Sequence, residues 1–295
     1  MTTDSAMPNR ADWLAGGSRH QLTGSQYSLF VRQDGPEGGL PVTVLHGFPS
    51  SSHDWAGVLP YLVAAGMRVT SLDFLGFGDS DKPHPHDYSI LEQAGFVEQV
   101  WDALGIDSTA LVAHDLGVSI AQELISRGPD RITSMTWLNG GVFADLHRPT
   151  RGQRLLRGPL GPLVARSISE KRLTASIRDI LGRPVDDSVM HDLWLSVDAR
   201  RGTRVLQALL RYMDERRTHM ERWSDAMRSY AGSQHFIWGP VDPVSGAHVL
   251  PRIREVVPGA TVTVLDGVGH YPQVEATEVV GPLIVASIVP SGPAS

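Results

Sequence analysis

The chain of 295 residues contains no cysteine, which excludes disulfide bonds and thiolate metal sites. It also lacks an apolar run long enough to cross a bilayer: the longest run near its end, residues 279–290, is short and is interrupted by Gly281 and Pro282. No apolar segment of the kind that a secretory signal needs occurs before residue 17. We therefore expect a cytoplasmic protein with no membrane partner.

Charge is unevenly distributed in an otherwise ordinary composition of 41% hydrophobic and 20% charged residues. Residues 148–228 carry 17 Lys and Arg against 10 Asp and Glu, whereas the rest of the chain carries 9 against 22. No nucleic-acid-binding motif accompanies the basic stretch, and acidic residues are interspersed in it. We expect a solvated helical surface there and no nucleic-acid partner.

Residues 113–117, Ala-His-Asp-Leu-Gly, have the form of a nucleophile elbow that carries aspartate instead of serine. The apolar run before them predicts a buried strand, and the pattern after them predicts a helix. Such a sharp turn needs small neighbours, and Ala113 and Gly117 meet that need. An aspartate there can attack an electrophilic alkyl carbon and form an ester. The alternative is that Asp115 only caps the helix, because Asp is a favoured N-cap residue.

Two later segments supply the groups that would release such an ester. Asp242 follows the apolar run 235–238, and His270 follows the run 261–265. The chain order nucleophile, acid, base is that of an α/β-hydrolase. His270 is the expected general base for hydrolysis, and Asp242 is expected to orient its ring.

A third segment, His46-Gly47-Phe48-Pro49, follows the apolar run 41–45, where this architecture forms its oxyanion hole. We expect the backbone amides of Phe48 and Leu116 to face the negative charge that develops during ester hydrolysis. An ordinary Gly-Pro loop after a strand is the alternative.

Strand signals alternate with helical patterns along most of the chain, which predicts an α/β fold with a mostly parallel sheet and helices on both faces. The strand signals occur at 26–32, 42–46, 69–73, 109–113, 134–138, 235–238 and 261–265. Between about residues 141 and 232 helical patterns dominate. We predict a core of residues 1–141 and 232–295 with a helical cap, residues 142–231, inserted. Only the ends, up to about residue 17 and from 290, look loose.

The chain resembles the α/β-hydrolases of the epoxide hydrolase–haloalkane dehalogenase branch, and among them the mesoderm-specific transcript proteins and their bacterial relatives. The resemblance extends from about residue 20 to 290, and its core motifs are specific to the branch. The segments that carry it are 46–55, 73–83, 114–124, 138–141, 147–149, 238–243 and 269–275.

The resemblance implies two proton-donating side chains in the cap, usually a pair of tyrosines, that protonate the epoxide oxygen as the ring opens. Tyr212 matches the second tyrosine, although a tyrosine merely packed on an amphipathic helix would look the same. No tyrosine occurs between Tyr88 and Tyr212, so the first is missing. His147 is the candidate for that role, with His191 or a purely structural His147 as alternatives. The resemblance also implies a cis Phe48–Pro49 peptide bond.

We therefore predict a cofactor-free hydrolase that converts a small apolar epoxide to a vicinal diol through an aspartyl ester. Phe48, Phe143 and Trp194 are candidate apolar walls of its substrate pocket, although core packing explains each equally well. No cluster of His and carboxylate residues has ligand spacing, so no metal is expected. The protein is expected to be a monomer or a homodimer.

Three other functions compete with this prediction. Haloalkane dehalogenation would use the same three residues, but that branch has Trp after the nucleophile and often Asn after His-Gly, where this chain has Leu116 and Phe48. A serine esterase would need Ser119, which falls within the predicted helix. A non-catalytic ligand-binding protein on this fold would have no need of the base His270.

Overall fold

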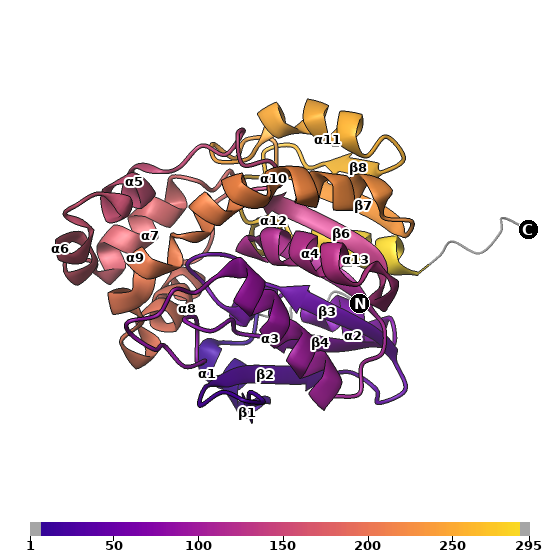
Figure 1. Ribbon diagram of the computed structural model, residues 1–295, viewed down its shortest axis with the longest axis horizontal. Helices are drawn as coiled ribbons and strands as arrows, with labels where there is room; N and C mark the ends of the chain where they lie inside the picture. The colour runs from indigo at the N-terminus through magenta and orange to yellow at the C-terminus, as the bar shows by residue number, and fades with distance from the viewer. Residues whose placement is uncertain (1–6, 290–295) are drawn as a thin grey trace, which may run out of the picture.

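A single mixed sheet of eight strands forms the centre of the molecule in the computed structural model, which describes residues 7–289 (Figure 1). The strand order is β1-β2-β4-β3-β5-β6-β7-β8, with β1 and β2 antiparallel to their neighbours and all other pairs parallel. The strands are β1 Gly17–Gln21, β2 Ser28–Asp34, β3 Leu40–Leu45, β4 Met67–Leu72, β5 Thr109–Asp115, β6 Ile132–Gly140, β7 Ser233–Trp238 and β8 Thr261–Val264.

Helices cover both faces of the sheet, as predicted. The side chains of β5 alternate between the two: Leu111 and Ala113 join the apolar cluster that includes α3 and α4, and Ala110 and Val112 join the cluster that includes α2 and α13. These helices are α2 Leu59–Ala64, α3 Ile90–Ala103, α4 Leu116–Arg127 and α13 Thr277–Ile288, with α11 Leu250–Val256 beside β8. No helix in the described range is long and apolar enough to span a membrane.

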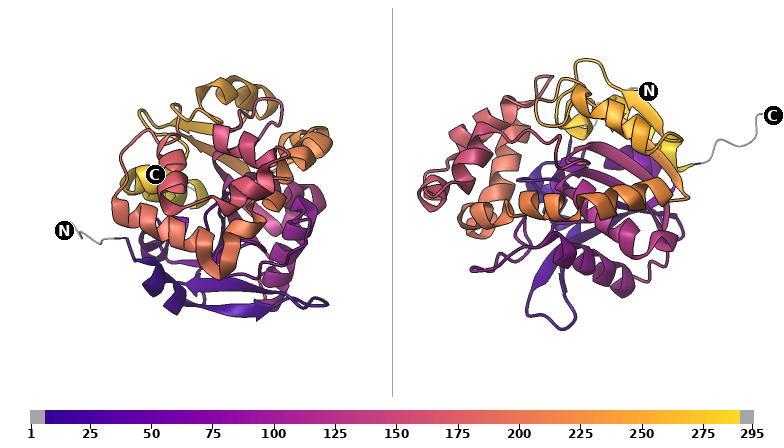
Figure 2. Two further views of the ribbon diagram at one scale, coloured as in Figure 1. Left: turned by 90° about the vertical axis from the view of Figure 1, so that its left-hand side faces the viewer. Right: turned by 45° about the horizontal axis from the view of Figure 1, so that its top comes forward.

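Between β6 and β7 the described chain forms helices and no strand, which agrees with the predicted helical insertion. Figure 2 shows these helices beyond the end of the sheet at which its parallel strands terminate. They are α5 Arg151–Arg157, α6 Gly161–Arg166, α7 Glu170–Arg178, α8 Asp187–Asp198, α9 Leu206–Leu209 and α10 Tyr212–Ser229, with the 3₁₀ helix η3 Ala199–Val205. The long helix α10 returns along the core and packs on α4. We keep the name cap for residues 142–231, which comprise these helices and the segment that precedes α5.

The N-terminal segment is ordered structure, so the prediction of a loose end up to residue 17 is wrong from residue 10 onward. Residues 10–15 form the helix α1, and β1 follows directly. Trp13 is the reason: its ring is buried, its indole N–H donates to Ser52 Oγ at 3.1 Å, and the guanidinium of Arg32 lies 4.5 Å from its ring centre. The prediction of a loose segment from residue 290 lies outside the described residues.

The remaining short elements connect the sheet to the site. They are the 3₁₀ helices η1 Ser52–Trp55, η2 Pro129–Arg131 and η4 Ala247–Val249, and the short helix α12 Pro272–Glu275. The Phe48–Pro49 peptide bond, which precedes η1, is cis, as predicted.

Candidate active site

Asp115 occupies a sharp turn between β5 and α4. Its backbone has φ 46° and ψ −104°, an unusual positive φ for a residue other than glycine. The next turn of chain passes so close to β3 that a Cβ added at Gly117 would lie 2.6 Å from the carbonyl oxygen of Leu45. The Asp115 side chain makes no capping hydrogen bond to α4, so helix capping does not explain this aspartate.

The Asp115 carboxylate is held by one backbone amide and one ring. Its Oδ1 accepts a hydrogen bond from the Phe48 amide at 2.8 Å, and its Oδ2 lies 3.5 Å from Nε2 of His270. The Phe48 amide therefore points at this carboxylate, as an oxyanion-hole donor would. Leu116 begins α4 next to it, but within residues 7–289 its amide makes no hydrogen bond to the carboxylate.

His270 is backed by a second buried carboxylate. Its Nδ1 lies 2.8 Å from Asp242 Oδ2. Asp242 also accepts hydrogen bonds from Asn139 Nδ2 at 3.1 Å, Ser245 Oγ at 2.7 Å and the Val244 amide at 2.7 Å. Asn139 was not among the predicted residues, although its place at the end of β6, beside the ends of β5 and β7, is where a parallel sheet gathers its polar groups.

Burial and mutual charge shift the pKa values of this array in opposite directions. Burial alone would lower the pKa of His270, but the Asp242 charge and the hydrogen bonds to Asp115 and Asp242 outweigh it and raise the pKa. Burial alone would raise the pKa of Asp115, yet its hydrogen bond to His270 and the nearby Arg216 charge lower it. Asp115 is therefore ionised at neutral pH, and two carboxylates stabilise the imidazolium form of His270.

The loop that carries His270 is fastened to the cap by a carboxylate and by a backbone hydrogen bond from the His270 amide to the Ile180 carbonyl at 2.9 Å. Glu275 Oε2 accepts from the amides of Gly182, Arg183 and Gly269 at 2.7–2.9 Å, and its Oε1 accepts from the Tyr271 amide. The contact is so close that a Cβ on Gly269 would lie 2.4 Å from the Gly182 nitrogen. The position of the histidine loop thus depends on the segment that follows α7.

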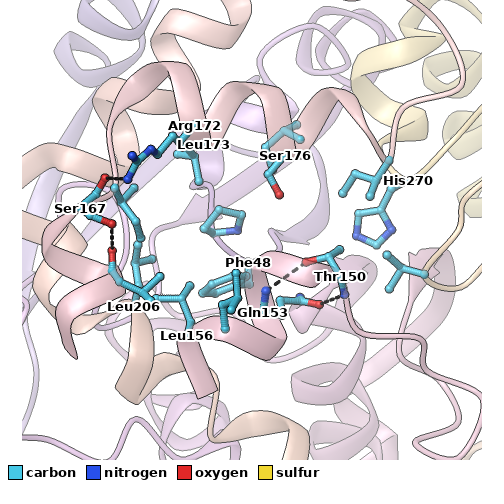
Figure 3. A pocket seen from close by; sticks show the side chains of 18 residues that line it. Phe48, Thr150, Gln153, Leu156, Ser167, Arg172, Leu173, Ser176, Leu206 and His270 are labelled. Carbon is cyan, nitrogen blue, oxygen red and sulfur yellow. Dashed lines mark hydrogen bonds between the residues drawn. The ribbon is translucent and has the colours of Figure 1, made fainter. Parts of the chain in front are cut away.

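A cavity of about 410 Å³ leads from this array into the cap (Figure 3). Phe48 and His270 form its inner end, and most of its wall is apolar and comes from the cap. The other lining residues are Pro49, Thr150, Gly152, Gln153, Leu155, Leu156, Val164, Ser167, Ile168, Arg172, Leu173, Ser176, Ile177, Ile180, Leu206 and Val244. Asp115 lies behind Phe48 and His270 and is 2% exposed.

Two of the predicted wall residues lie elsewhere. Phe143 is buried, and the guanidinium of Arg252 lies 5.5 Å from its ring centre. Both residues line a separate hollow between α10 and α11. Trp194 is half-buried in α8 and is not among the residues that line the cavity. Phe48 is the predicted wall residue that the cavity contains.

Tyr212, the first residue of α10, lies next to the array. Its ring centre is 6.0 Å from that of Phe48, and its hydroxyl accepts a hydrogen bond from Gln153 Nε2 at 3.3 Å. Burial and the Asp115 charge raise the pKa of Tyr212, so the hydroxyl keeps its proton. Gln153 lines the cavity and forms a capping box with Thr150 at the start of α5. Gln153 was not predicted from the sequence, although the Thr-x-x-Gln spacing of residues 150–153 is typical of a capping box at the start of a helix.

Arg216, also missed from the sequence, links Tyr212 to the elbow. Its side chain is buried; Nη2 donates to the Asp115 carbonyl at 2.9 Å, and Nε donates to Ser119 Oγ at 2.7 Å. The guanidinium lies 4.4 Å from the Tyr212 ring centre. Ser119 is thus engaged inside α4 and does not face the cavity, which argues against a serine esterase. Nη1 of Arg216 has no partner among the described residues.

The two candidate histidines of the cap differ. His147 lines a small cavity beside Arg216, and neither of its buried ring nitrogens has a hydrogen-bond partner within the described part of the chain. Burial and the Arg216 charge lower the pKa of His147 to about 3, so its ring is neutral at pH 7. His191 is exposed and pairs with Glu170 at 2.6 Å, away from the array. Of the two, only His147 is close to the elbow residues.

Residues 41–277 match the family described as alpha/beta hydrolase fold. The chain belongs to this family. The α/β-hydrolase chain is 38% identical to LipZ of Mycobacterium tuberculosis over 276 residues, which cover 91% of this chain and 94% of LipZ. It is 39% identical to the human mesoderm-specific transcript homolog protein over 249 residues, 79% of this chain and 74% of that protein.

The fold of this α/β-hydrolase is also found in solved structures. A crystal structure of a Klebsiella pneumoniae protein, provisionally described as an epoxide hydrolase, superposes with a TM-score of 0.78 at 17% sequence identity. The match covers 93% of this chain and 98% of the other. The predicted fold class and the predicted resemblance to mesoderm-specific transcript proteins are both confirmed.

Proposed function

We propose that this α/β-hydrolase converts an apolar epoxide to a vicinal diol through an ester on Asp115. The observation that carries the proposal is the unequal treatment of the two Asp115 oxygens. The Phe48 amide holds Oδ1, whereas Oδ2 faces His270 without a backbone donor. Oδ2 is therefore the oxygen that attacks an epoxide carbon, and Oδ1 becomes the carbonyl oxygen of the ester.

Ring opening needs a proton for the departing oxygen. The Tyr212 hydroxyl accepts its hydrogen bond from Gln153, so its own hydrogen is left to donate to the epoxide oxygen. Neutral His147 carries one ring N–H and is the second candidate donor. The C–O bond breaks as the Asp115–carbon bond forms, and the proton from the cap converts the alkoxide to a hydroxyl.

Ester formation then prepares the base. The charge and hydrogen bond of Asp115 help to raise the pKa of His270, and both change when Asp115 becomes a neutral ester. The pKa of His270 falls, so the imidazolium passes its proton to the Tyr212 phenolate that ring opening leaves. Neutral Nε2 then accepts a proton from the water that attacks the ester carbonyl. The negative charge develops on Oδ1, where the amides of Phe48 and Leu116 would stabilise it. Collapse releases the diol and restores Asp115.

Haloalkane dehalogenation would follow the same two steps, with a halide in place of the alkoxide. It requires N–H donors that hold the halide, and the residue after the nucleophile is Leu116, whose side chain has none. One feature favours the epoxide. The Tyr212 ring lies beside Phe48, and its hydroxyl can protonate an alkoxide, which a departing halide does not need.

The decisive experiment traps the ester in the His270→Gln variant, which lacks the base. The variant is incubated with a panel of epoxides and haloalkanes, and intact-protein and peptide mass spectra are recorded. We expect an adduct on Asp115 with the mass of a whole epoxide. An alkyl adduct without halogen would assign the protein to dehalogenation.

Two controls complete the trap. His235 lies in β7 and bonds Thr263 Oγ1, so His235→Gln should turn over normally and accumulate no adduct. The double variant Asp115→Asn/His270→Gln should form none. Adducts on another residue, or a folded His270→Gln variant that remains unlabelled by the whole panel, would argue against the proposed function.

A further inference from the structure

Three leucines project from the outer cap helices. Leu155 in α5, Leu163 in α6 and Leu160 between them are 62, 60 and 64% exposed, more than any other large apolar side chain in the range 7–289. Figure 1 shows α5 and α6 at the outer edge of the molecule, far from the sheet. Single exposed leucines are ordinary on protein surfaces, but three within nine residues form an apolar patch without an intramolecular cover.

The patch is surrounded by basic charge that the protein does not neutralise. Residues 148–169 contain five arginines and no acidic residue. Elsewhere in the cap several exposed arginines are paired with carboxylates, as Arg178 is with Asp187 and Arg211 is with Asp87. Four exposed arginines of this stretch form no ion pair with any residue in the range 7–289: Arg148, Arg151, Arg154 and Arg166. The last three lie in α5 and α6, beside the leucines. Their charge is available to an external anion.

The same face borders the outer end of the substrate cavity through Leu155. Leu155, Ser167 and Arg172 are exposed and also line the cavity whose inner end is formed by Phe48 and His270. In Figure 3, Arg172 and Ser167 lie at the end opposite His270. A molecule that enters between α5, α6 and α7 would pass from this face directly into an apolar channel.

We propose that this leucine–arginine face (Leu155, Leu160 and Leu163 with Arg151, Arg154 and Arg166) docks the cap on an anionic lipid surface. The leucines enter the boundary between headgroups and acyl chains, and the arginines pair with lipid phosphates. An apolar substrate dissolved in the lipid would then reach the cavity without crossing water. This source of substrate rests on the proposed function, whereas the docking itself does not.

Charge decides between lipid and a second copy of the chain as the occupant. A symmetric dimer through this face would place the unpaired arginines of both copies together, which is unfavourable. Anionic lipid satisfies the leucines and the arginines at once. Docking of this kind needs no spanning helix, so it departs from the prediction of no membrane partner without requiring a transmembrane segment.

The test measures co-sedimentation of the whole protein with vesicles of phosphatidylcholine, with and without phosphatidylglycerol, and no epoxide is present. The wild type should bind the anionic vesicles more strongly. Leu155→Ser/Leu160→Ser/Leu163→Ser should lower the partition coefficient at least about tenfold. Arg151→Gln/Arg154→Gln/Arg166→Gln should lower it by roughly fivefold per arginine.

A matched control removes two exposed apolar side chains that lie outside the cap, on the α/β part of the molecule. Leu40 and Val279 are 44 and 39% exposed, and Leu40→Ser/Val279→Ser should leave vesicle binding unchanged. Thermal unfolding of all variants checks that they fold. No binding by the wild type, or binding that the leucine variant retains, would overturn the proposal. Sedimentation that changes from dimer to monomer in the leucine variant, without vesicle binding, would assign the face to self-association.

The outcomes separate the two proposals. Vesicle binding is read without substrate, and the ester trap is read in solution without lipid. Loss of one result therefore leaves the other intact.

Discussion

The candidate catalytic residues on the core side and the polar groups nearest to them on the cap side differ in how completely they are bonded. On the core side, Asp242 accepts from three donors besides His270, and the Phe48 amide holds Asp115. On the cap side, Arg216 has an unpartnered nitrogen, and both ring nitrogens of His147 lack partners within residues 7–289. Buried polar groups are rarely left without partners. The candidate catalytic residues of the core are thus held in place by hydrogen bonds, whereas His147 and Arg216 border a small cavity of their own with nitrogens left unbonded by the described residues.

The strongest test of this contrast removes the core nucleophile. Asp115→Asn should lower turnover of every substrate by at least about 10⁴-fold, because an amide cannot form the ester. Asn is the suitable replacement, since it tolerates a positive φ better than most residues. Steady-state turnover is measured, with intact mass to verify the amide. Exposed Asp107→Asn is the control. Substantial residual turnover would show that Asp115 is not the nucleophile.

A substitution of Asp54 tests how a buried carboxyl group of the core affects the free energy of unfolding. It is buried beside Ser50, with which it hydrogen-bonds, and burial raises its pKa to about 8. A carboxyl whose pKa rises on folding stabilises the fold fully below its unfolded pKa, and this contribution is lost as pH rises through the folded pKa. Asp54→Asn should therefore gain unfolding free energy relative to the wild type between about pH 4 and pH 8, by up to about 1.4 kcal/mol per pH unit.

Urea unfolding at several pH values measures this gain. Asp107→Asn, an exposed change of the same chemistry, should follow the wild-type pH dependence. If the two variants show the same dependence, then the pKa of Asp54 is not raised in the folded protein.

Arg216 lies where the two regions meet, so its variant should affect both stability and turnover. Lys keeps the charge but cannot donate to Ser119 and to the Asp115 carbonyl through one planar group. Arg216→Lys should lower the free energy of unfolding by roughly 2–3 kcal/mol and reduce turnover. Chemical denaturation and kinetics check this. The exposed neighbour change Arg217→Lys should do neither.

The smallest expected effect belongs to the cap. Tyr212→Phe should lower turnover of epoxides by about ten- to a hundredfold, because His147 and water can still donate a proton. Tyr230→Phe is the matched control, because its hydroxyl donates to Ile132 at the far end of β6. Single-turnover rates of ester formation would locate the effect. Equal rates for Tyr212→Phe and the wild type would remove Tyr212 from the mechanism.

The core side of the site was predictable from the sequence because its residues follow apolar strands. Asp115, Asp242 and His270 each come after such a run, and parallel strands bring their carboxyl ends to one edge. The cap side was less predictable. Gln153 and Arg216 reach the site through the packing of helices, which no short motif encodes.

The apolar residues that line the cavity were also hard to predict from the sequence. Phe143 packs under Arg252, and Trp194 lies away from the cavity, because an apolar side chain suits a core as well as a pocket wall. Helix α1 also depends on tertiary contacts: Trp13 is buried only because Ser52 and Arg32 are brought to it from other elements. These contacts lie far apart along the chain, and local patterns do not report them.

The carboxylate of Glu275 has a consequence for protein engineering. It joins the amides of Gly182 and Arg183, just after α7, to those of Gly269 and Tyr271 on either side of His270. Caps are attractive units to exchange between relatives when a new specificity is wanted. In this protein, a graft whose two junctions both lie after residue 183 would leave these contacts, and with them the position of His270, unchanged. A graft that replaced this segment would have to bring its own partner for Glu275, or the loop that carries His270 would lose this tie to the cap.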